Sequence, residues 1–221
     1  MKKRKLKVYS ENWIEEPFAI SRGSNDNFDV VVVNLSQDGY VGWGEGTPTE
    51  HYNESIPQCI KLIEDFRNKI ESGITRSEIQ KTMPKGAARN ALDCALWDLE
   101  SKINGKRIWE LNSIKEHLKK INFSKVEFVT TVFSIGIDTP YKMGEIAKKN
   151  SNRPILKIKL KGDGDLERLI SIKEKAPYSR LIIDANEGWT PNHYKTFVPE
   201  LMKLGVEMIE QPFPVNQDNI L

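Results

Sequence analysis

The hydrophobic pattern in the first third of the chain predicts a small sheet followed by helices. A β-branched, apolar run over residues 29–35 predicts a strand, and residues 40–45 predict a second strand after a Gln-Asp-Gly turn. Apolar residues at helical spacing then predict two helices, one from the expected N-cap Ser55 to about residue 70 and one over residues 86–103. We therefore expect an α+β unit in residues 1–115.

From about residue 127 onwards, strand-like and helix-like segments alternate. The pattern predicts strands at residues 128–135, 154–160, 181–184 and 206–210, separated by helices at residues 139–149 and 165–175 and by a third helix that begins at Thr190. Pro199 lies inside this third helix and should kink or split it. The alternation predicts a parallel sheet covered by helices, which is either an open, doubly wound sheet or part of a (β/α)8 barrel.

The composition is that of a globular protein without a strong charge bias. The 221 residues include 33 Lys and Arg against 31 Asp and Glu, which argues against a nucleic-acid or membrane-surface partner, because such proteins carry clustered excess positive charge. The longest apolar stretch, Val30–Val33, is too short to cross a bilayer, and no signal-peptide core follows the basic N-terminus. We expect a soluble, cytoplasmic protein.

The two cysteines, Cys59 and Cys94, each fall on an apolar helical pattern and show no CxxC spacing. We expect both to be buried free thiols in a reducing compartment, rather than a disulfide or a zinc site. Trp97, one turn after Cys94, is expected to lie in the core.

Lysines alternate with apolar residues in the predicted strand that ends at Leu160, so Lys157 and Lys159 share one face of that strand. On a half-exposed strand this pattern is ordinary amphipathicity. In a parallel sheet beneath helices it is unusual, because such strands are apolar on both faces. Two ammonium groups on one face repel each other and burial disfavours their charge, so one of them could lose its proton near neutral pH and act as a general base.

Carboxylates end the two strands that follow. Asp184 closes one strand and Glu210 the next, and Lys159, Asp184 and Glu210 are spaced by about one strand-plus-helix unit each. A single acidic residue at such a position is usually a cap or turn residue, but three charged strand ends in register are expected to converge at one edge of the sheet. Two carboxylates there are suitable ligands for Mg2+.

A lysine base beside a carboxylate-bound Mg2+ suits one kind of reaction. Removing a proton from the carbon α to a carboxylate places negative charge on the carboxylate oxygens, and a divalent cation at those oxygens stabilises that charge. The sequence therefore predicts proton abstraction α to a carboxylate.

The chain resembles the muconate-lactonizing-enzyme branch of the enolase superfamily and, within it, the dipeptide epimerases of the L-Ala-D/L-Glu type. The segments that carry the resemblance are residues 20–24, 42–48, 52–55, 87–99, 156–160, 184–186 and 210–212. A lysine base with Mg2+ is the known arrangement of that superfamily. The resemblance implies an α/β fold with an α+β capping domain in residues 1–115 and an incomplete (β/α) TIM-type barrel in residues 116–221.

The resemblance also assigns roles to the strand ends. Lys159 matches the second lysine of the family's K-x-K motif, the base on one face of the substrate, and Lys157 matches the first lysine, which supports it. Asp184 and Glu210 match the first two Mg2+ ligands.

Two loop residues are weaker candidates for binding the substrate. Arg22 matches a cap-domain loop residue that binds the acidic side chain of the dipeptide in similar epimerases, although a solvated loop arginine is an equal alternative. Tyr52 lies in the other cap loop, where a packing role competes. Asn53 departs from the glycine usual in that loop, which leaves its conformation open.

The family's barrel has eight strands, whereas this chain ends at Leu221 after about three. The third metal carboxylate, the lysine of the opposite face and the acidic residues that hold the substrate's ammonium group would all follow. We therefore expect an epimerase fragment that is inactive alone, with a small dipeptide as the substrate of the complete enzyme and a possible homo-oligomer. The alternatives are an o-succinylbenzoate synthase or cycloisomerase of the same superfamily, or a non-catalytic remnant that acts as a binding or oligomerising module.

Overall fold

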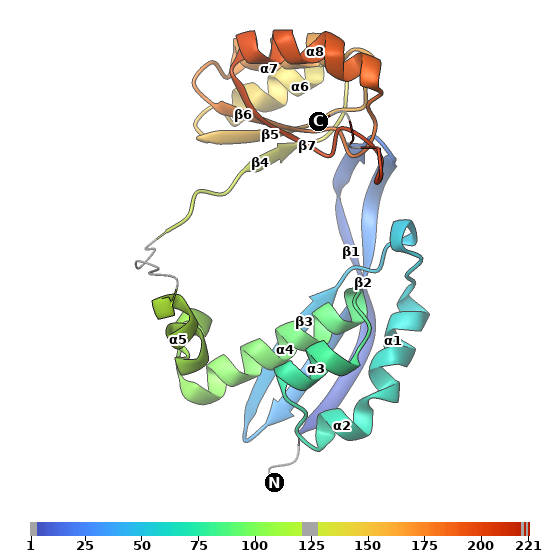
Figure 1. Cartoon of the computed structure of the whole chain (residues 1–221), viewed down its shortest axis with the longest axis vertical. Helices are drawn as coiled ribbons and strands as arrows, with labels where there is room; N and C mark the ends of the chain where they lie inside the picture. The colour runs from blue at the N-terminus through green and yellow to red at the C-terminus, as the bar shows by residue number, and fades with distance from the viewer. Residues whose placement is uncertain (1–3, 121–127, 218, 220) are drawn as a thin grey trace. The chain divides into compact units, whose positions relative to one another are not determined.

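A computed structural model describes residues 4–120, 128–217, 219 and 221 (Figure 1). The chain divides into two compact units. Unit 1 comprises Met1–Ile14 and Asn27–Lys125, and unit 2 comprises Glu15–Asp26 and Val126–Leu221. The tip of the first hairpin thus belongs with unit 2, which the expected division at residue 115 did not include.

Unit 1 contains a three-stranded sheet in the order β1-β2-β3. Its strands are β1 (Lys5–Ile20), β2 (Gly23–Gln37) and β3 (Tyr40–Gly46). The predicted hairpin is confirmed, because β2 and β3 pair antiparallel from Val31 opposite Gly46 to Gln37 opposite Tyr40. The intervening turn contains Gly39, whose φ of 84° favours glycine. The long strand β1 was not predicted from the hydrophobic pattern.

Helices pack on one face of this sheet. They are α1 (Ile56–Asp65), α2 (Arg67–Glu71), α3 (Arg76–Thr82), α4 (Ala87–Asn104) and α5 (Asn112–Lys120), with short 3-10 turns η1 (Glu50–Tyr52) and η2 (Ile108–Glu110). The helix predicted to run to residue 70 is in fact two helices separated at Phe66. Ser55 precedes α1, but its side chain makes no capping hydrogen bond; its hydroxyl instead contacts the side-chain oxygen of Gln58. The end of α4 at Gly105, which has φ 60°, is as predicted.

The contact between β3 and α4 depends on small residues on both sides. The face of β3 that meets the helix carries three glycines at every second position, Gly42, Gly44 and Gly46. A Cβ atom at these positions would collide with backbone carbonyls of the alanines that line α4, which are Ala95, Ala91 and Ala87 respectively. The helix therefore lies directly on the strand backbone, which only glycine permits.

Two expectations for the long helix α4 are wrong. Cys59 of α1 is a buried free thiol as expected, but Cys94 of α4 is exposed, because it lies on the side of the helix away from the core. Trp97 is only half-buried, and the guanidinium of Arg76 stacks 3.1 Å from its ring centroid. The core stripe of α4 consists of its alanines and leucines instead.

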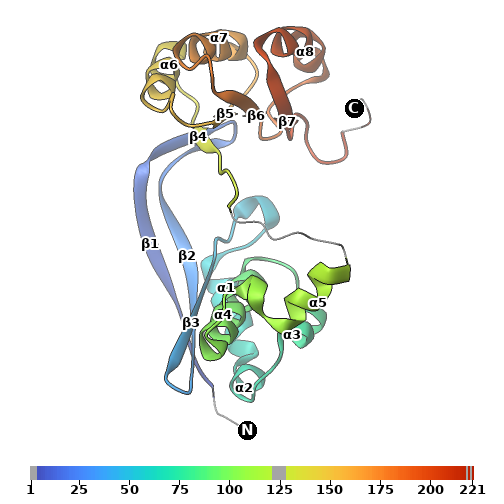
Figure 2. The same ribbon diagram turned by 90° about the vertical axis from the view of Figure 1, so that its left-hand side faces the viewer.

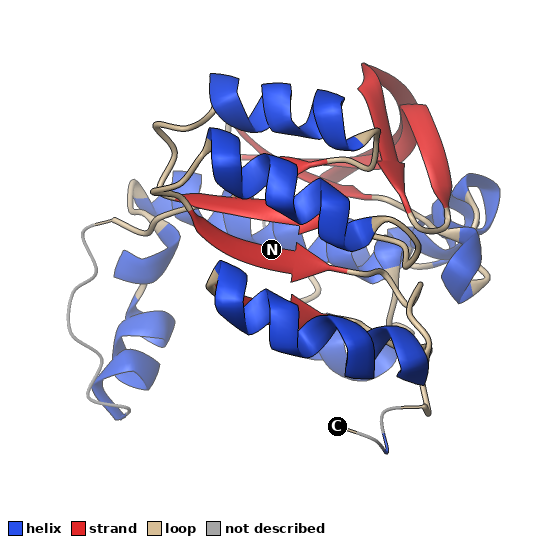
Figure 3. Ribbon diagram, turned by 90° about the horizontal axis from the view of Figure 1, so that it is seen from above, coloured by secondary structure: helices blue, strands red, loops and turns tan. Residues whose placement is uncertain are grey.

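Unit 2 is a parallel sheet in the order β4-β5-β6-β7. Its elements are β4 (Phe133–Ile135), α6 (Pro140–Lys149), β5 (Ile155–Lys159), α7 (Asp165–Lys175), β6 (Arg180–Asp184), α8 (Pro191–Leu204) and β7 (Val206–Glu210). Figures 2 and 3 show α6, α7 and α8 side by side on one face of the sheet. The strand predicted at residues 128–135 is shorter than expected, since only its last three residues pair with β5.

Pro199 does not split α8, which is continuous to Leu204. Proline removes the hydrogen bond to the carbonyl four residues earlier, that of Lys195. Both Pro199 and Lys195 are exposed, so water can satisfy that carbonyl. Among the described residues, no helix is both long enough and apolar enough to span a membrane.

The two faces of the β5 strand differ in chemistry. Leu156 and Ile158 are fully buried in a core with Leu169 of α7 and Ile183 of β6. Lys157 and Lys159 point to the opposite face, as the alternation predicted, and each remains partly accessible. The helix-covered face is therefore the hydrophobic core, and the opposite face carries the charged groups.

Candidate active site

The structure brings the three charged strand ends together. In the parallel register Lys159 lies opposite Asp184, and Asp184 lies opposite Glu210. The strands reach the same level because each βα unit returns the chain to the same edge of the sheet. Lys157, two residues before Lys159 on the same face, joins the group.

The side chains of this strand-end cluster form a compact network of alternating charge. Lys159 Nζ lies 2.7 Å and Lys157 Nζ 3.1 Å from Asp184 Oδ2, and Lys157 Nζ lies 2.7 Å from Glu210 Oε2. The Asp184 side chain is 1% exposed, those of the lysines 14–19%, and that of Glu210 38%. Two cations and two anions thus balance at a site that solvent reaches mainly at Glu210.

The carboxylate partners of Lys157 determine the direction of its pKa shift. Burial lowers the pKa of Lys157, but hydrogen bonds to Glu210 and Asp184, together with their negative charges, outweigh burial and raise it. Burial alone would raise the pKa of Asp184, but hydrogen bonds from Lys159, the Asn186 backbone and Lys157 lower it overall. The carboxylates therefore stabilise the charged lysine that sequence reasoning treated as repelled.

Asn186 is a member of the cluster that sequence reasoning did not single out. Lys159 Nζ donates to Asn186 Oδ1 at 3.0 Å, and the Asn186 backbone N–H donates to Asp184 Oδ1 at 2.9 Å. Asn186 is 6% exposed and has φ 44°, a left-handed conformation that asparagine tolerates better than most residues. The sequence feature that could have identified Asn186 is the Asp-Ala-Asn triplet at the end of a predicted strand.

Arg22 lies next to this turn, at the tip of the β1–β2 hairpin. Its Nη1 donates to the Asn186 carbonyl at 3.1 Å and lies 3.8 Å from Glu187 Oε2, while Ser21 Oγ donates to the same carbonyl at 2.8 Å. The hairpin tip therefore holds the backbone whose side chain contacts Lys159. Substrate binding by Arg22 stays a prediction.

Tyr52 belongs to unit 1, whereas the strand-end cluster is built from unit 2. Its side chain is exposed, and its ring packs edge-on against His51. Asn53, whose conformation the sequence left open, is left-handed with φ 56°. The role of Tyr52 also stays a prediction.

A buried carboxylate fixes the loop that follows Lys159. Asp165 is fully buried and accepts hydrogen bonds from the backbone of Gly162 at 2.7 Å, the backbone of Lys161 at 3.1 Å and Trp189 Nε1 at 2.8 Å. Arg168 forms an ion pair with it at 3.2 Å. These bonds join the β5–α7 loop, which follows Lys159 directly, to the segment after β6.

The carboxylates of the cluster fit part of a Mg2+ site. Lys157 already places one positive charge between Asp184 and Glu210, so the two carboxylates can share a cation. Mg2+ prefers such oxygen ligands and retains several waters. Within the described part of the chain, no group of three His, Cys, Asp or Glu side chains is arranged to hold a metal, so these two residues supply only part of a ligand set.

Comparison with known proteins places both units in one family. The profile described as "Mandelate racemase / muconate lactonizing enzyme, N-terminal domain" matches residues 3–112, and the one described as "Enolase C-terminal domain-like" matches residues 143–220. The chain belongs to the mandelate racemase/muconate lactonizing enzyme family. Its fold is accordingly an α+β N-terminal domain followed by the first part of an enolase-type barrel.

Relatives within this family carry epimerase names. The chain is 38% identical to an L-Ala-D/L-Glu epimerase of Escherichia coli K12 over 99% of its own length and 66% of that protein. A crystal structure of an enolase family member from Agrobacterium tumefaciens, with homology to dipeptide epimerases and with bound sodium and L-Ala-L-Glu, superposes with a TM-score of 0.88 at 35% identity, covering 98% of this chain and 64% of that one.

A dipeptide epimerase from Enterococcus faecalis, complexed with Mg and L-Leu-L-Tyr, superposes with a TM-score of 0.81 at 27% identity over 97% of this chain and 62% of that chain. The chain thus spans about two thirds or less of the length of these relatives.

Proposed function

We propose that this family member supplies one half of the active site of a Mg2+-dependent epimerase for L-Ala-D/L-Glu-type dipeptides. The observation that carries the proposal is the convergence of Lys159, Asp184 and Glu210 at one sheet edge, with Lys159 Nζ 2.7 Å from Asp184. The names of the relatives from E. coli and A. tumefaciens support an acidic dipeptide as the substrate.

In this proposal Lys159 is the base that removes the proton from the substrate carbon α to a carboxylate. Asp184 and Asn186 orient its amine through the 2.7 Å and 3.0 Å hydrogen bonds. Lys157 supports the substrate carboxylate, and its contact with Glu210 fixes its position. Mg2+, held by Asp184 and Glu210, would supply positive charge where negative charge develops on the substrate carboxylate.

Epimerisation requires a proton acceptor on one face of the carbon and a proton donor on the other. The strand-end cluster in the described residues provides lysines from a single strand, and two carboxylates for a metal. We therefore infer that the 221-residue chain does not epimerise dipeptides by itself and needs the residues that the longer relatives carry beyond the matched region.

A fusion tests this proposal directly. Residues 1–221 are joined to the part of the E. coli epimerase beyond the matched region, and epimerisation of L-Ala-L-Glu is measured with and without Mg2+. We expect Mg2+-dependent turnover by the fusion and none by the chain alone. Turnover by the chain alone would disprove the half-site, and a soluble, folded fusion without turnover or Mg2+ binding would disprove the function.

Arg22 gives the proposal a test of substrate class. If its guanidinium binds the acidic side chain, Arg22→Ala in the fusion raises KM for L-Ala-L-Glu but leaves KM for L-Ala-L-Leu nearly unchanged. An equal increase in KM for both dipeptides would show that Arg22 only holds the turn at Asn186 and does not bind the acidic side chain. If the unsubstituted fusion prefers L-Ala-L-Leu, the proposed epimerase activity stands, but the proposed acidic dipeptide substrate is wrong.

A further inference from the structure

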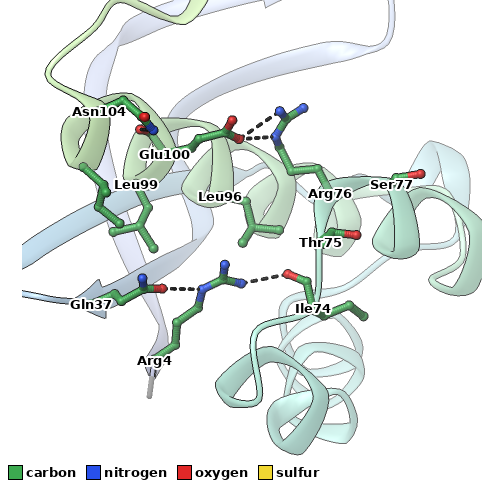
Figure 4. Close-up of a pocket in the computed structure, with 11 residues that line it drawn as sticks. Arg4, Gln37, Ile74, Thr75, Arg76, Ser77, Leu96, Leu99, Glu100 and Asn104 are labelled. Atoms are coloured by element: carbon green, nitrogen blue, oxygen red, sulfur yellow. Dashed lines mark hydrogen bonds and ion pairs between the residues drawn. The ribbon is translucent and has the colours of Figure 1, made fainter. Parts of the chain in front are cut away.

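A cavity of about 530 Å³ opens in unit 1 between the start of β1, the end of β2, the segment leading into α3 and the last turns of α4 (Figure 4). Its size is that of a pocket for a small organic ligand. The lysines and carboxylates of the proposed epimerase site all belong to unit 2, so the chemistry proposed above leaves this cavity without a role.

One of the two arginines that line the cavity is neutralised. Arg76 Nε donates to Glu100 Oε2 at 2.9 Å, and its Nη2 lies 2.8 Å from the same oxygen. The Arg76 guanidinium also stacks on the Trp97 ring, which fixes it at the rim. This pair contributes no net charge to the cavity.

The other arginine has no such partner. Arg4 Nε donates to Gln37 Oε1 at 3.0 Å and its Nη1 donates to the Ile74 carbonyl at 2.7 Å, so both bonds go to neutral oxygens. Among the described residues, no ion pair involves Arg4 and no hydrogen bond uses its Nη2. Figure 4 shows its guanidinium between Gln37 and Ile74, with Leu96 beside it. Burial lowers the pKa of Arg4, and the more distant charge of Glu100 compensates only in part.

The cavity therefore combines one uncompensated, partly buried cation with an apolar wall. Burying a cation without an anion is costly, and the unused Nη2 can donate a charge-assisted hydrogen bond to a carboxylate. The wall is formed by Ile103, which is partly exposed, and by the edges of Leu96 and Leu99, which are only 4% and 2% exposed. A dianion such as phosphate would exceed the single net positive charge and meet the carboxylate of Glu100, which favours a monoanion.

We propose that this cavity is a binding site for a small aliphatic monocarboxylate, with its carboxylate on Arg4 and its hydrocarbon chain against Ile103 and the edges of Leu96 and Leu99. The site is separate from the proposed epimerase function and stands whether or not that function does.

NMR titration of the 221-residue chain with 4-methylpentanoate tests the proposal. The ligand should produce saturable shifts of backbone amides in two segments that contribute lining residues, residues 74–77 and the end of α4 from Leu99 to Asn104. The neutral amide of the same shape, 4-methylpentanamide, and inorganic phosphate should bind at least about tenfold more weakly, because neither makes a matched single-charge bond to Arg4. Absence of saturable binding, or equal affinity for the amide or phosphate, would overturn the proposal.

Arg4→Gln removes the charge and keeps a hydrogen-bonding group, and should weaken 4-methylpentanoate binding by about tenfold or more. The matched control is Lys5→Gln, which removes a charge from the exposed neighbouring side chain and should change the affinity by less than about twofold, because solvent screens it. Equal losses in both variants would show a non-specific charge effect. If Arg4→Gln fails to fold, shifts of the unsubstituted chain outside the two lining segments still refute the site.

Discussion

The two sheets of this chain differ in the residues that face their covering helices. In unit 1 the face of β3 that meets α4 carries Gly42, Gly44 and Gly46, so that backbone meets backbone. In unit 2 the helix-covered face of β5 is packed with Leu156 and Ile158, and the opposite face carries the lysines. Small residues at every second position of β3 indicate close packing of a helix on the strand. Charged residues at the ends of successive strands indicate a candidate active site. Substitutions should separate these two requirements.

Lys159→Ala should have the largest effect on activity. In the fusion described above, loss of the proposed base should reduce turnover of L-Ala-L-Glu by about 10²–10⁴-fold. Lys161→Ala is the matched control, because the Lys161 side chain is exposed two residues later. Comparable turnover by both variants would remove Lys159 from the reaction.

Asp165→Ala should destabilise unit 2 by about 3–5 kcal/mol, because it leaves Arg168 without its buried partner and the Trp189 and Gly162 N–H groups without an acceptor. Amide hydrogen exchange in β5 and β6 of the isolated chain measures the loss. Asp163→Ala, in the same loop but fully exposed, should change little. Equal protection in both variants would show that the network does not hold the loop.

Gly44→Ala should destabilise unit 1 by about 1–3 kcal/mol, because the added methyl group collides with the Ala91 carbonyl and pushes α4 away from β3. Amide exchange in β2 reports the effect, and turnover per folded molecule of the fusion should not change. The control Glu45→Ala, at the exposed adjacent position, should cost less than about 0.5 kcal/mol. A stable Gly44→Ala variant would show that the close approach is not required.

The smallest expected effect is a loss of stability at low pH. Hydrogen bonding from Arg67 lowers the pKa of Glu64 in the folded chain, an effect that burial partly opposes. A lowered carboxyl pKa gives stability that is present above the unfolded value and lost as the pH falls through the folded value. Because both side chains are more than a third exposed, Glu64→Gln should cost only about 0.5 kcal/mol at pH 7 and nothing near pH 2, measured by urea unfolding. A cost independent of pH would contradict this origin.

The sequence predicted unit 2 well because its elements follow local rules. Thr-Pro pairs begin α6 and α8, and the register of Lys159, Asp184 and Glu210 follows from the repeat of strand and helix. Asn186 was not predicted as a site residue, because its hydrogen bond with Lys159 depends on the left-handed turn that brings its side chain back to Lys159. The raised pKa of Lys157 could not be predicted from the spacing of the lysines, because it depends on the carboxylates of the neighbouring strands.

Unit 1 was predicted less completely, because its details depend on contacts between distant segments. Periodicity continued past Phe66 although the chain bends there, and it placed Cys94 in the core although that side of α4 faces outwards. The glycines of β3 have a packing role that becomes evident only once α4 lies on them.

The hairpin tip that joins unit 2 has a consequence for biosynthesis. Ser21 leaves the ribosome early, but its acceptor is the carbonyl of Asn186, 165 positions later. At translation rates of about 5–20 residues per second, the tip waits roughly 10–30 s for that acceptor. Nascent chains that do not yet contain residue 186 should therefore be bound by chaperones or cleaved by proteases at the unpaired hairpin tip. Pausing of translation before residue 186 should lower the yield of folded protein.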